Sequence, residues 1–325
     1  MHCFRSILLW LVLAFLPVVK LAAQLPADAG QVWQTYDIGP FVQVAGPGSQ
    51  KHVIDWVLQE TGYEAWHGDT VASLTASDSA LRVFHAEEMQ TRVADVVKRF
   101  TVDAKAPHRF SVRVLGVGSP AWRADAGPAM QPIAAATPGV HAWILSREAA
   151  AMLVGRLKAR GDCQELPTGA TLAANGVPTV LAGGRTRPYV KDVAVRPDAW
   201  PGWQRLDASC GEGFELDVHP LITTDRMAVE AVIRCRIDQI ERMAAVTVTV
   251  PTADRQRVQI EVPQMSAVRI GERFRWPASQ CLVIGLGLVP WPVPGQNTAS
   301  TAAILTDAKR TDVLVVVEPR LADGS

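Results

Sequence analysis

Histidines are the side chains that could most readily bind a metal or move a proton in this 325-residue chain. None stands at a metal-ligand spacing such as H-E-x-x-H, so we predict no metal site. Two glycine pairs lack the further Gly or Lys of a dinucleotide or phosphate loop, so they predict turns and no cofactor. With no G-x-S-x-G elbow and no cysteine beside an activating base, we predict no catalytic residue. The histidines are His2, His52, His67, His85, His108, His141 and His219, and the glycine pairs are Gly116-x-Gly118 and Gly183-Gly184.

Two carboxylate pairs could serve glycoside hydrolysis, Asp225 with Glu230 or Asp238 with Glu241. That mechanism depends on the distance between the two carboxyl groups, which a sequence does not give. The alternative is that these residues are solvated side chains of turns and strand edges. Both interpretations stay open from the residues alone, and the hydrolase is the less favoured of the two.

An aromatic loop, Trp200-Pro-Gly-Trp203, could stack on a sugar ring or rest on a neighbouring subunit. The alternative is a loop held down by packing two large side chains. The preceding segment, 185–196, carries four basic residues against Asp192, a mild basic patch that is typical of a solvated hairpin. Its basic residues are Arg185, Arg187, Lys191 and Arg196.

Composition excludes two broad classes of protein. Lys+Arg and Asp+Glu number 32 each, and this balance argues against nucleic-acid binding, which relies on excess positive charge. An apolar fraction of 48% with zero net charge argues against disorder. At this length, one large or two medium domains with a substantial core are expected.

The N-terminus predicts export. Arg5 precedes an apolar run over residues 7–19, and small residues at 21–23 offer a cleavage point. The run is too short to span a bilayer, so we predict a signal peptide over residues 1–23, with a retained anchor as the alternative.

Four cysteines follow the leader, and an oxidising compartment would permit one or two disulfides whose pairing the sequence leaves open. Cys235 and Cys281 lie in strand-like runs and are interpreted as buried thiols. The other two are Cys163 and Cys210.

Hydrophobic periodicity divides the chain into a small N-terminal module over 31–101, a linker over 102–107 and a strand-rich region over 108–320. Helical spacing marks 51–60 and 86–100, with a short strand at 81–84 between them. Residues 228–237 and 257–262 alternate between apolar and polar, the period of half-buried antiparallel strands. Residues 281–288 and 313–317 are apolar on both faces and predict central strands, whereas 118–139 predicts a long loop. The predicted fold class is therefore a strand-rich α+β protein with a mostly antiparallel C-terminal domain.

From residue 162 onward, the order of short motifs resembles the C-terminal domain of bacterial secretins, the ring-forming outer-membrane channels of type II and type III secretion. Residues 183–190 are similar to a Gly-x-x-x-Pro-Tyr stretch of that family, and residues 213–222 to its Gly-x-x-Leu-x-Val-x-Pro-x-Ile strand. Five such segments occur in the family's order: 166–179 (LPTGATLAANGVPT), 183–190 (GGRTRPYV), 213–222 (GFELDVHPLI), 277–288 (PASQCLVIGLGL) and 312–319 (DVLVVVEP).

The resemblance implies a non-enzymatic protein of the periplasm or outer membrane of a Gram-negative-type bacterium. It would assemble into homo-oligomeric rings and work with other secretion or envelope proteins, without binding nucleic acid. A ring channel needs strands shared between copies, because a closed sheet leaves no edge. The chain has room for one periplasmic module where full secretins stack several, and it lacks the family's Leu-Gly segment between 287 and 312. A periplasmic scaffold or binding protein without a pore is therefore an alternative, and an exported polysaccharide hydrolase is a second.

Overall fold

The structure is a computed structural model that describes residues 30–68, 71–105, 107–166, 169–251, 255–290 and 310–322. The predicted signal peptide over 1–23 lies outside the described residues. Within them, the chain forms three sheets in which every strand pair is antiparallel. The strand-rich α+β fold class predicted from the sequence is therefore confirmed.

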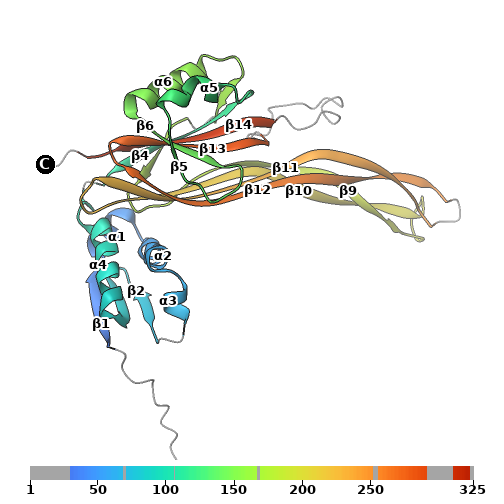
Figure 1. Ribbon diagram of the computed structural model, residues 1–325. Helices are drawn as coiled ribbons and strands as arrows, with labels where there is room; N and C mark the ends of the chain where they lie inside the picture. The colour runs from blue at the N-terminus through green and yellow to red at the C-terminus, as the bar shows by residue number, and fades with distance from the viewer. Residues whose placement is uncertain are drawn as a thin grey trace, which may run out of the picture.

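A three-stranded sheet, ordered β1-β3-β2, and four helices form the N-terminal unit, residues 30–105 (Figure 1). Both predicted helices are present as α2 and α4, because their apolar residues repeat at helical spacing and are buried. Acidic residues in the first turn of α4 and basic residues in its last turn complement the helix dipole. The elements are β1 (Gln31–Asp37), α1 (Gly39–Ala45), α2 (Gln50–Thr61), α3 (Glu64–His67), β2 (Ser73–Ala76), β3 (Ala80–Ala86) and α4 (Glu87–Thr101).

A seven-stranded sheet, here the short sheet, follows in the order β5-β6-β13-β14-β4-β7, with β8 also pairing β4. The two apolar runs near the C-terminus become its central strands β13 and β14, as predicted. The elements of this part are β4 (Arg109–Val117), α5 (Trp122–Ala126), the 3₁₀ helix η1 (Gly127–Ala129), β5 (Gln131–Ile133), β6 (His141–Ser146), α6 (Arg147–Lys158), β7 (Cys163–Glu165), β8 (Thr171–Ala174), β13 (Gln280–Pro290) and β14 (Arg310–Arg320).

Helices α5 and α6 cover the face of the short sheet that points away from the rest of the chain (Figure 1). The Ser146 hydroxyl caps α6 by accepting a 3.1 Å hydrogen bond from the Ala149 N–H. The prediction of one long loop over 118–139 is wrong, because this segment contains α5, η1 and β5. Buried Trp122 and its neighbour Arg123 hold α5 in place by donating hydrogen bonds to Asp312 of β14.

A four-stranded sheet, here the long sheet, runs beneath the short sheet and extends far beyond it (Figure 1). Its order is β12-β11-β10-β9, so two antiparallel hairpins lie side by side. The alternating segments predicted as strands fall within β11 and β12. The strands are β9 (Thr179–Val195), β10 (Trp203–Ile222), β11 (Ala228–Thr249) and β12 (Arg257–Pro277), of 17, 20, 22 and 21 residues.

The main core lies between the two sheets. Side chains that alternate along the base of the long sheet meet those from the facing side of β4, β13 and β14. Phe274 and Trp276 of β12 and Phe110 of β4 are among the largest buried side chains. Leu221 and Val232, also from the base of the long sheet, join instead the core of the N-terminal unit. The base of the long sheet is therefore covered on one face by the short sheet and contacted on the other by the N-terminal unit.

Candidate functional site

The carboxylates suggested for hydrolysis do not come together as an acid–base pair. Asp225 lies in the turn between β10 and β11, where it accepts hydrogen bonds from the Thr223 hydroxyl and the Met227 N–H. Glu230 is buried and is bound by three arginines. Asp238 pairs with Arg236 of its own strand and with Arg269 of β12, and Glu241 pairs with Arg310 of β14. All of these carboxylates are occupied by structural contacts.

The aromatic loop lies at the far tip of the β9–β10 hairpin. Trp200 is 96% exposed, whereas the Trp203 indole N–H donates a 2.8 Å hydrogen bond to Gln256. Asp225 and Glu230 lie at the other end of the hairpin strands, about 60 Å away for a strand of this length. The hydrolase hypothesis required paired carboxyl groups beside these tryptophans, and the geometry removes that support.

The four described cysteines are all free. Cys235 and Cys281 are buried, as predicted, and burial raises the pKa of Cys235 to about 12 and that of Cys281 to about 11. Such thiols stay protonated and unreactive at neutral pH. Within the described residues, no cluster of three or more His, Cys, Asp or Glu side chains could hold a metal ion.

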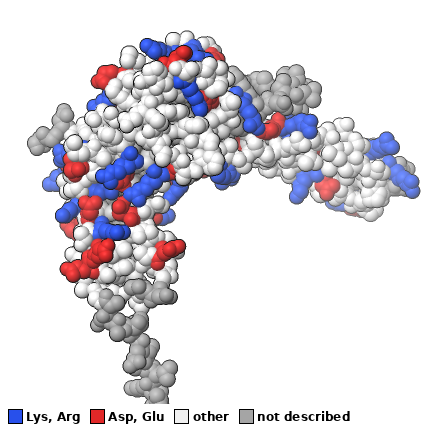
Figure 2. Space-filling model, in the orientation of Figure 1, with Lys and Arg blue, Asp and Glu red and all other residues white. Residues whose placement is uncertain are grey.

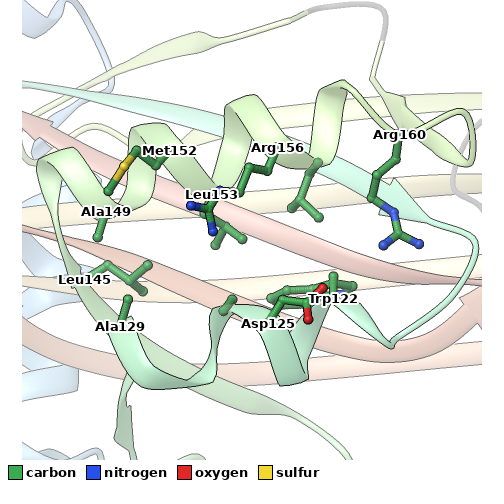
Figure 3. Close-up of a pocket in the computed structure, with 11 residues that line it drawn as sticks. Trp122, Asp125, Ala129, Leu145, Ala149, Met152, Leu153, Arg156 and Arg160 are labelled. Atoms are coloured by element: carbon green, nitrogen blue, oxygen red, sulfur yellow. The ribbon is translucent and has the colours of Figure 1, made fainter.

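A cavity of about 210 Å³ opens between α5–η1 and α6 on the outer side of the short sheet (Figure 3). Its floor is apolar, with Trp122 and Leu153, and its rim carries Asp125, Arg156 and Arg160. Arg160 is already paired with Asp162 through two hydrogen bonds of 2.8 Å. The cavity has no arrangement of polar groups that identifies a ligand.

An ion-pair network fixes the N-terminal unit to the base of the long sheet, and Figure 2 shows acidic and basic side chains gathered at this junction. Arg99 of α4 is almost fully buried, and it donates hydrogen bonds to the backbone carbonyls of Leu221 and Ile222. Its guanidinium also lies 3.4 Å from the carboxylate of Glu230. Arg99 and Arg273 both stack over Trp56 of α2, at 5.4 and 5.6 Å from its ring.

Burial raises the pKa of the Glu230 carboxyl, but the hydrogen bond from Arg273 and the nearby guanidinium groups outweigh burial and hold the pKa below its usual range. The sequence does not signal this network, because its members in the N-terminal unit lie more than a hundred residues from those in the long sheet.

Among the described residues, the outer edges of the long sheet are the most conspicuous place where a strand has no partner strand. Strands β9 and β12 end the sheet, and within the described residues no strand pairs with the outer side of either one. Unpaired edges of long strands are templates for pairing with another chain. The basic segment 185–196, predicted as a solvated hairpin, belongs to β9 up to Val195 and so lies along one of these edges.

No helix in the described part of the chain is long and apolar enough to cross a membrane. The sequence matches no protein-family model and no curated protein. Among solved structures, the chain is similar to the secretin domain of InvG from the Salmonella SPI-1 injectisome, with 13% identity and a TM-score of 0.28. The match covers 86% of this chain and 81% of that one.

The chain is also similar to ExeD of Aeromonas hydrophila, with 9% identity and a TM-score of 0.29 over 90% of this chain and 61% of that one. A third similar structure is the type II secretin GspD of enteropathogenic Escherichia coli, with 13% identity and a TM-score of 0.22 over 90% and 88% of the two chains.

Proposed function

We propose that this chain is a secretin-like, non-enzymatic subunit that pairs with copies of itself to form a ring in the cell envelope. The observation that carries the proposal is the long sheet with two unpaired outer edges. The five sequence segments in the order of the secretin C-terminal domain point the same way. We further propose that the N-terminal unit is a periplasmic module separated from the ring-forming region near residues 102–107.

Strand direction suits such a ring. The long sheet has four strands, all antiparallel to their neighbours, so β9 and β12 run in opposite directions. When β9 of one copy meets β12 of the next, the new pair is therefore also antiparallel. Repeating this heterologous contact closes a ring in which no sheet edge remains exposed.

Strand length suits an envelope-spanning assembly. Strands of 17 to 22 residues are about 55–75 Å long at the usual rise, whereas a tilted strand needs only about 9–11 residues to cross a bilayer. Accordingly, we place the ring at the outer membrane, with the N-terminal unit on the periplasmic side. Export by the predicted signal peptide and partnership with other secretion or envelope proteins belong to the same proposal.

The test is the size of the protein after mild detergent extraction, by size-exclusion chromatography and electron microscopy. We expect a large ring that resists SDS, and a monodisperse monomer at high concentration would contradict the proposal. A ring without a conducting pore is the second candidate, because the ladder between β10 and β11 ends at Gly213 and Asp238 and does not join the two hairpins farther out. Conductance across a planar bilayer distinguishes the two: a ring that gives no current favours a scaffold.

A further inference from the structure

Prolines occur in both outer strands of the long sheet. Pro188 lies within β9, and Pro263 and Pro277 lie within β12. Proline has no N–H, so it fits into a sheet only where its nitrogen points away from the ladder. Each of these prolines therefore marks a place where the outer edge cannot donate a hydrogen bond.

Two hydrogen bonds fix the direction of these nitrogens. The Val190 N–H points away from β10, since it donates to the Glu261 carboxylate at 3.4 Å. Because the backbone groups of an antiparallel strand alternate in direction, Pro188 faces the same outer edge. On β11, the Ile240 N–H points toward β10, where it donates to Glu212 at 3.2 Å. Ile240 is paired with Met265 of β12, so the Met265 N–H points to the outer edge of β12. By the same alternation, the nitrogen of Pro263, two residues away, faces that outer edge too.

The long sheet is four strands wide only at its base. Strands β10 and β11 stop pairing at Gly213 and Asp238, beyond which each hairpin continues alone. At this level, the outer strands have reached Gly184 in β9 and Ala267 in β12. Pro188 and Pro263 follow four residues farther out on their respective strands. The pairing between β10 and β11 therefore ends, and the row of outward N–H donors on β9 and β12 is interrupted by a proline, near the same level of the sheet.

Beyond the prolines, the two hairpins of one chain contact each other. The Val190 N–H of β9 donates to Glu261 of β12, and the indole N–H of Trp203 at the start of β10 donates to Gln256 just before β12, so the two hairpins of one chain face each other. At the base the situation differs. Within the described residues, no group hydrogen-bonds to the outward N–H of Val180, Ala182, Gly184 or Thr186. The far edges are thus partly satisfied within one copy, and the base edges await a partner.

We propose that copies pair only along the base of the long sheet. Residues 179–187 of β9 in one copy form an antiparallel ladder with residues 264–272 of β12 in the next. This inference rests on the proposed ring. In one copy, Gly184 and Ala267 lie at the same level of the four-stranded base. When this level continues straight across the interface, Gly184 lies opposite the partner's Ala267. The ladder then ends where Pro188 meets the partner's Pro263, and the far hairpins stay unshared.

Proline substitutions test the extent of the ladder. Ala182→Pro and Ala267→Pro each remove one outward donor at the base without touching the inner ladder. Gln259→Pro does the same on the far half of β12 and is the matched control, because all three side chains are exposed. We expect each base variant to reduce SDS-resistant multimer at least tenfold, and Gln259→Pro to assemble like the wild type. Circular dichroism confirms that every variant is folded.

Two results would overturn the inference while leaving the ring intact: base variants that assemble normally, or a Gln259→Pro variant that assembles as poorly as they do. If the wild type forms no multimer at all, the proposed ring itself is wrong. The comparison of wild type and variants therefore separates the two failures.

Cysteine crosslinking tests the register. In the proposed register, Gly183 lies opposite the partner's Val268, so Gly183→Cys with Val268→Cys should give a ladder of disulfide-linked multimers. Within one copy these positions are three strand spacings apart, about 14 Å, which is too far for a disulfide. Gly183→Cys with Ser266→Cys is the shifted control, and the wild-type cysteines give the background. Equal crosslinking by both pairs would refute the register.

Discussion

The base and the far half of the long sheet are built from the same four strands but have opposite environments. At the base, Phe274 and Ile233 are almost completely buried between the two sheets. In the far half, Leu206, Val246 and Val262 are each more than 40% exposed. Alternation of apolar and polar residues thus makes a strand in both regions, but only the base has a layer to pack against. The contrast indicates that the base maintains the fold and the far half is available for contacts outside it.

The charged side chains differ between the two regions as the apolar ones do: an ion pair is buried at the base, and another is exposed at the far tip. Glu230 and Arg99 form a buried ion pair at the base, and their hydrogen-bonding groups are satisfied by neighbouring side chains and backbone carbonyls. At the far tip, Arg196 and Asp198 are paired but largely exposed to solvent. Buried charges are costly to leave without partners, whereas exposed pairs contribute little. Substitutions should therefore have strong effects at the base and weak effects far from it.

The largest expected effect is on packing between the sheets. Phe274→Ala should lower the free energy of unfolding by about 3–5 kcal/mol, because it removes a buried ring and leaves a cavity. Val262→Ala, on the exposed far half of the same strand, should stay within about 0.5 kcal/mol. Urea denaturation of both variants measures the difference. Similar losses at the two positions would show that the far half is packed as tightly as the base.

The next effect concerns the buried carboxylate at the junction. Glu230→Gln removes the negative charge that neutralises Arg99, whose side chain is only 3% exposed. We expect a loss of about 3 kcal/mol, since the buried Arg99 then keeps only Glu60, 3.9 Å away, as a carboxylate partner. Glu88→Gln is the matched control, because its pair with Arg92 is exposed on α4 and should be worth less than about 0.5 kcal/mol. A loss for Glu230→Gln no larger than that of the control would rule out a structural role for the network.

Acid should weaken the same junction through His219. Burial lowers the pKa of His219 to about 4, and its hydrogen bond with the Gly176 carbonyl offsets this only in part. The unfolded chain binds a proton near pH 6.5, whereas the folded chain resists protonation until about pH 4. Stability should therefore fall as the pH drops through this window, by about 2–3 kcal/mol from this residue.

The measurement is the free energy of unfolding of the wild type and of His219→Gln between pH 8 and pH 4. At pH 8 the histidine is neutral in both states, so that value gives the baseline difference between the two proteins. The variant should show a shallower loss on acidification. Parallel curves would mean that His219 does not contribute to the acid sensitivity.

Local patterns in the sequence predict those strands and helices in which the buried residues repeat at the spacing of a strand or a helix. Alternation over 228–237 predicts β11, and the spacing of Val53, Trp56 and Val57 predicts α2. Helix α5 is missed because its Ala-, Pro- and Gly-rich segment has no such pattern. It is held instead by Asp312, a residue nearly two hundred positions away.

The candidate interface was only partly visible in the sequence for a similar reason. The secretin-like motifs suggest a strand-sharing ring, and the prolines are plain in the sequence. Which edge Pro188 and Pro263 face depends on the register between strands, and that register is set by tertiary structure. The buried pair of Arg99 and Glu230 has no local signature either, because it joins the N-terminal unit to the long sheet.

The smallest effect on stability should come from Trp200, at the tip of the far half. Its side chain is 96% exposed, so Trp200→Ala should change the free energy of unfolding by less than about 0.5 kcal/mol. Its fluorescence should nevertheless be quenched by acrylamide in the monomer, whereas the fluorescence of buried Trp56 and Trp276 should not. Comparing quenching of the wild type with that of Trp200→Ala isolates this residue. If Trp200 becomes protected when copies assemble, the far hairpins take part in a contact; if it stays accessible, assembly is confined to the base.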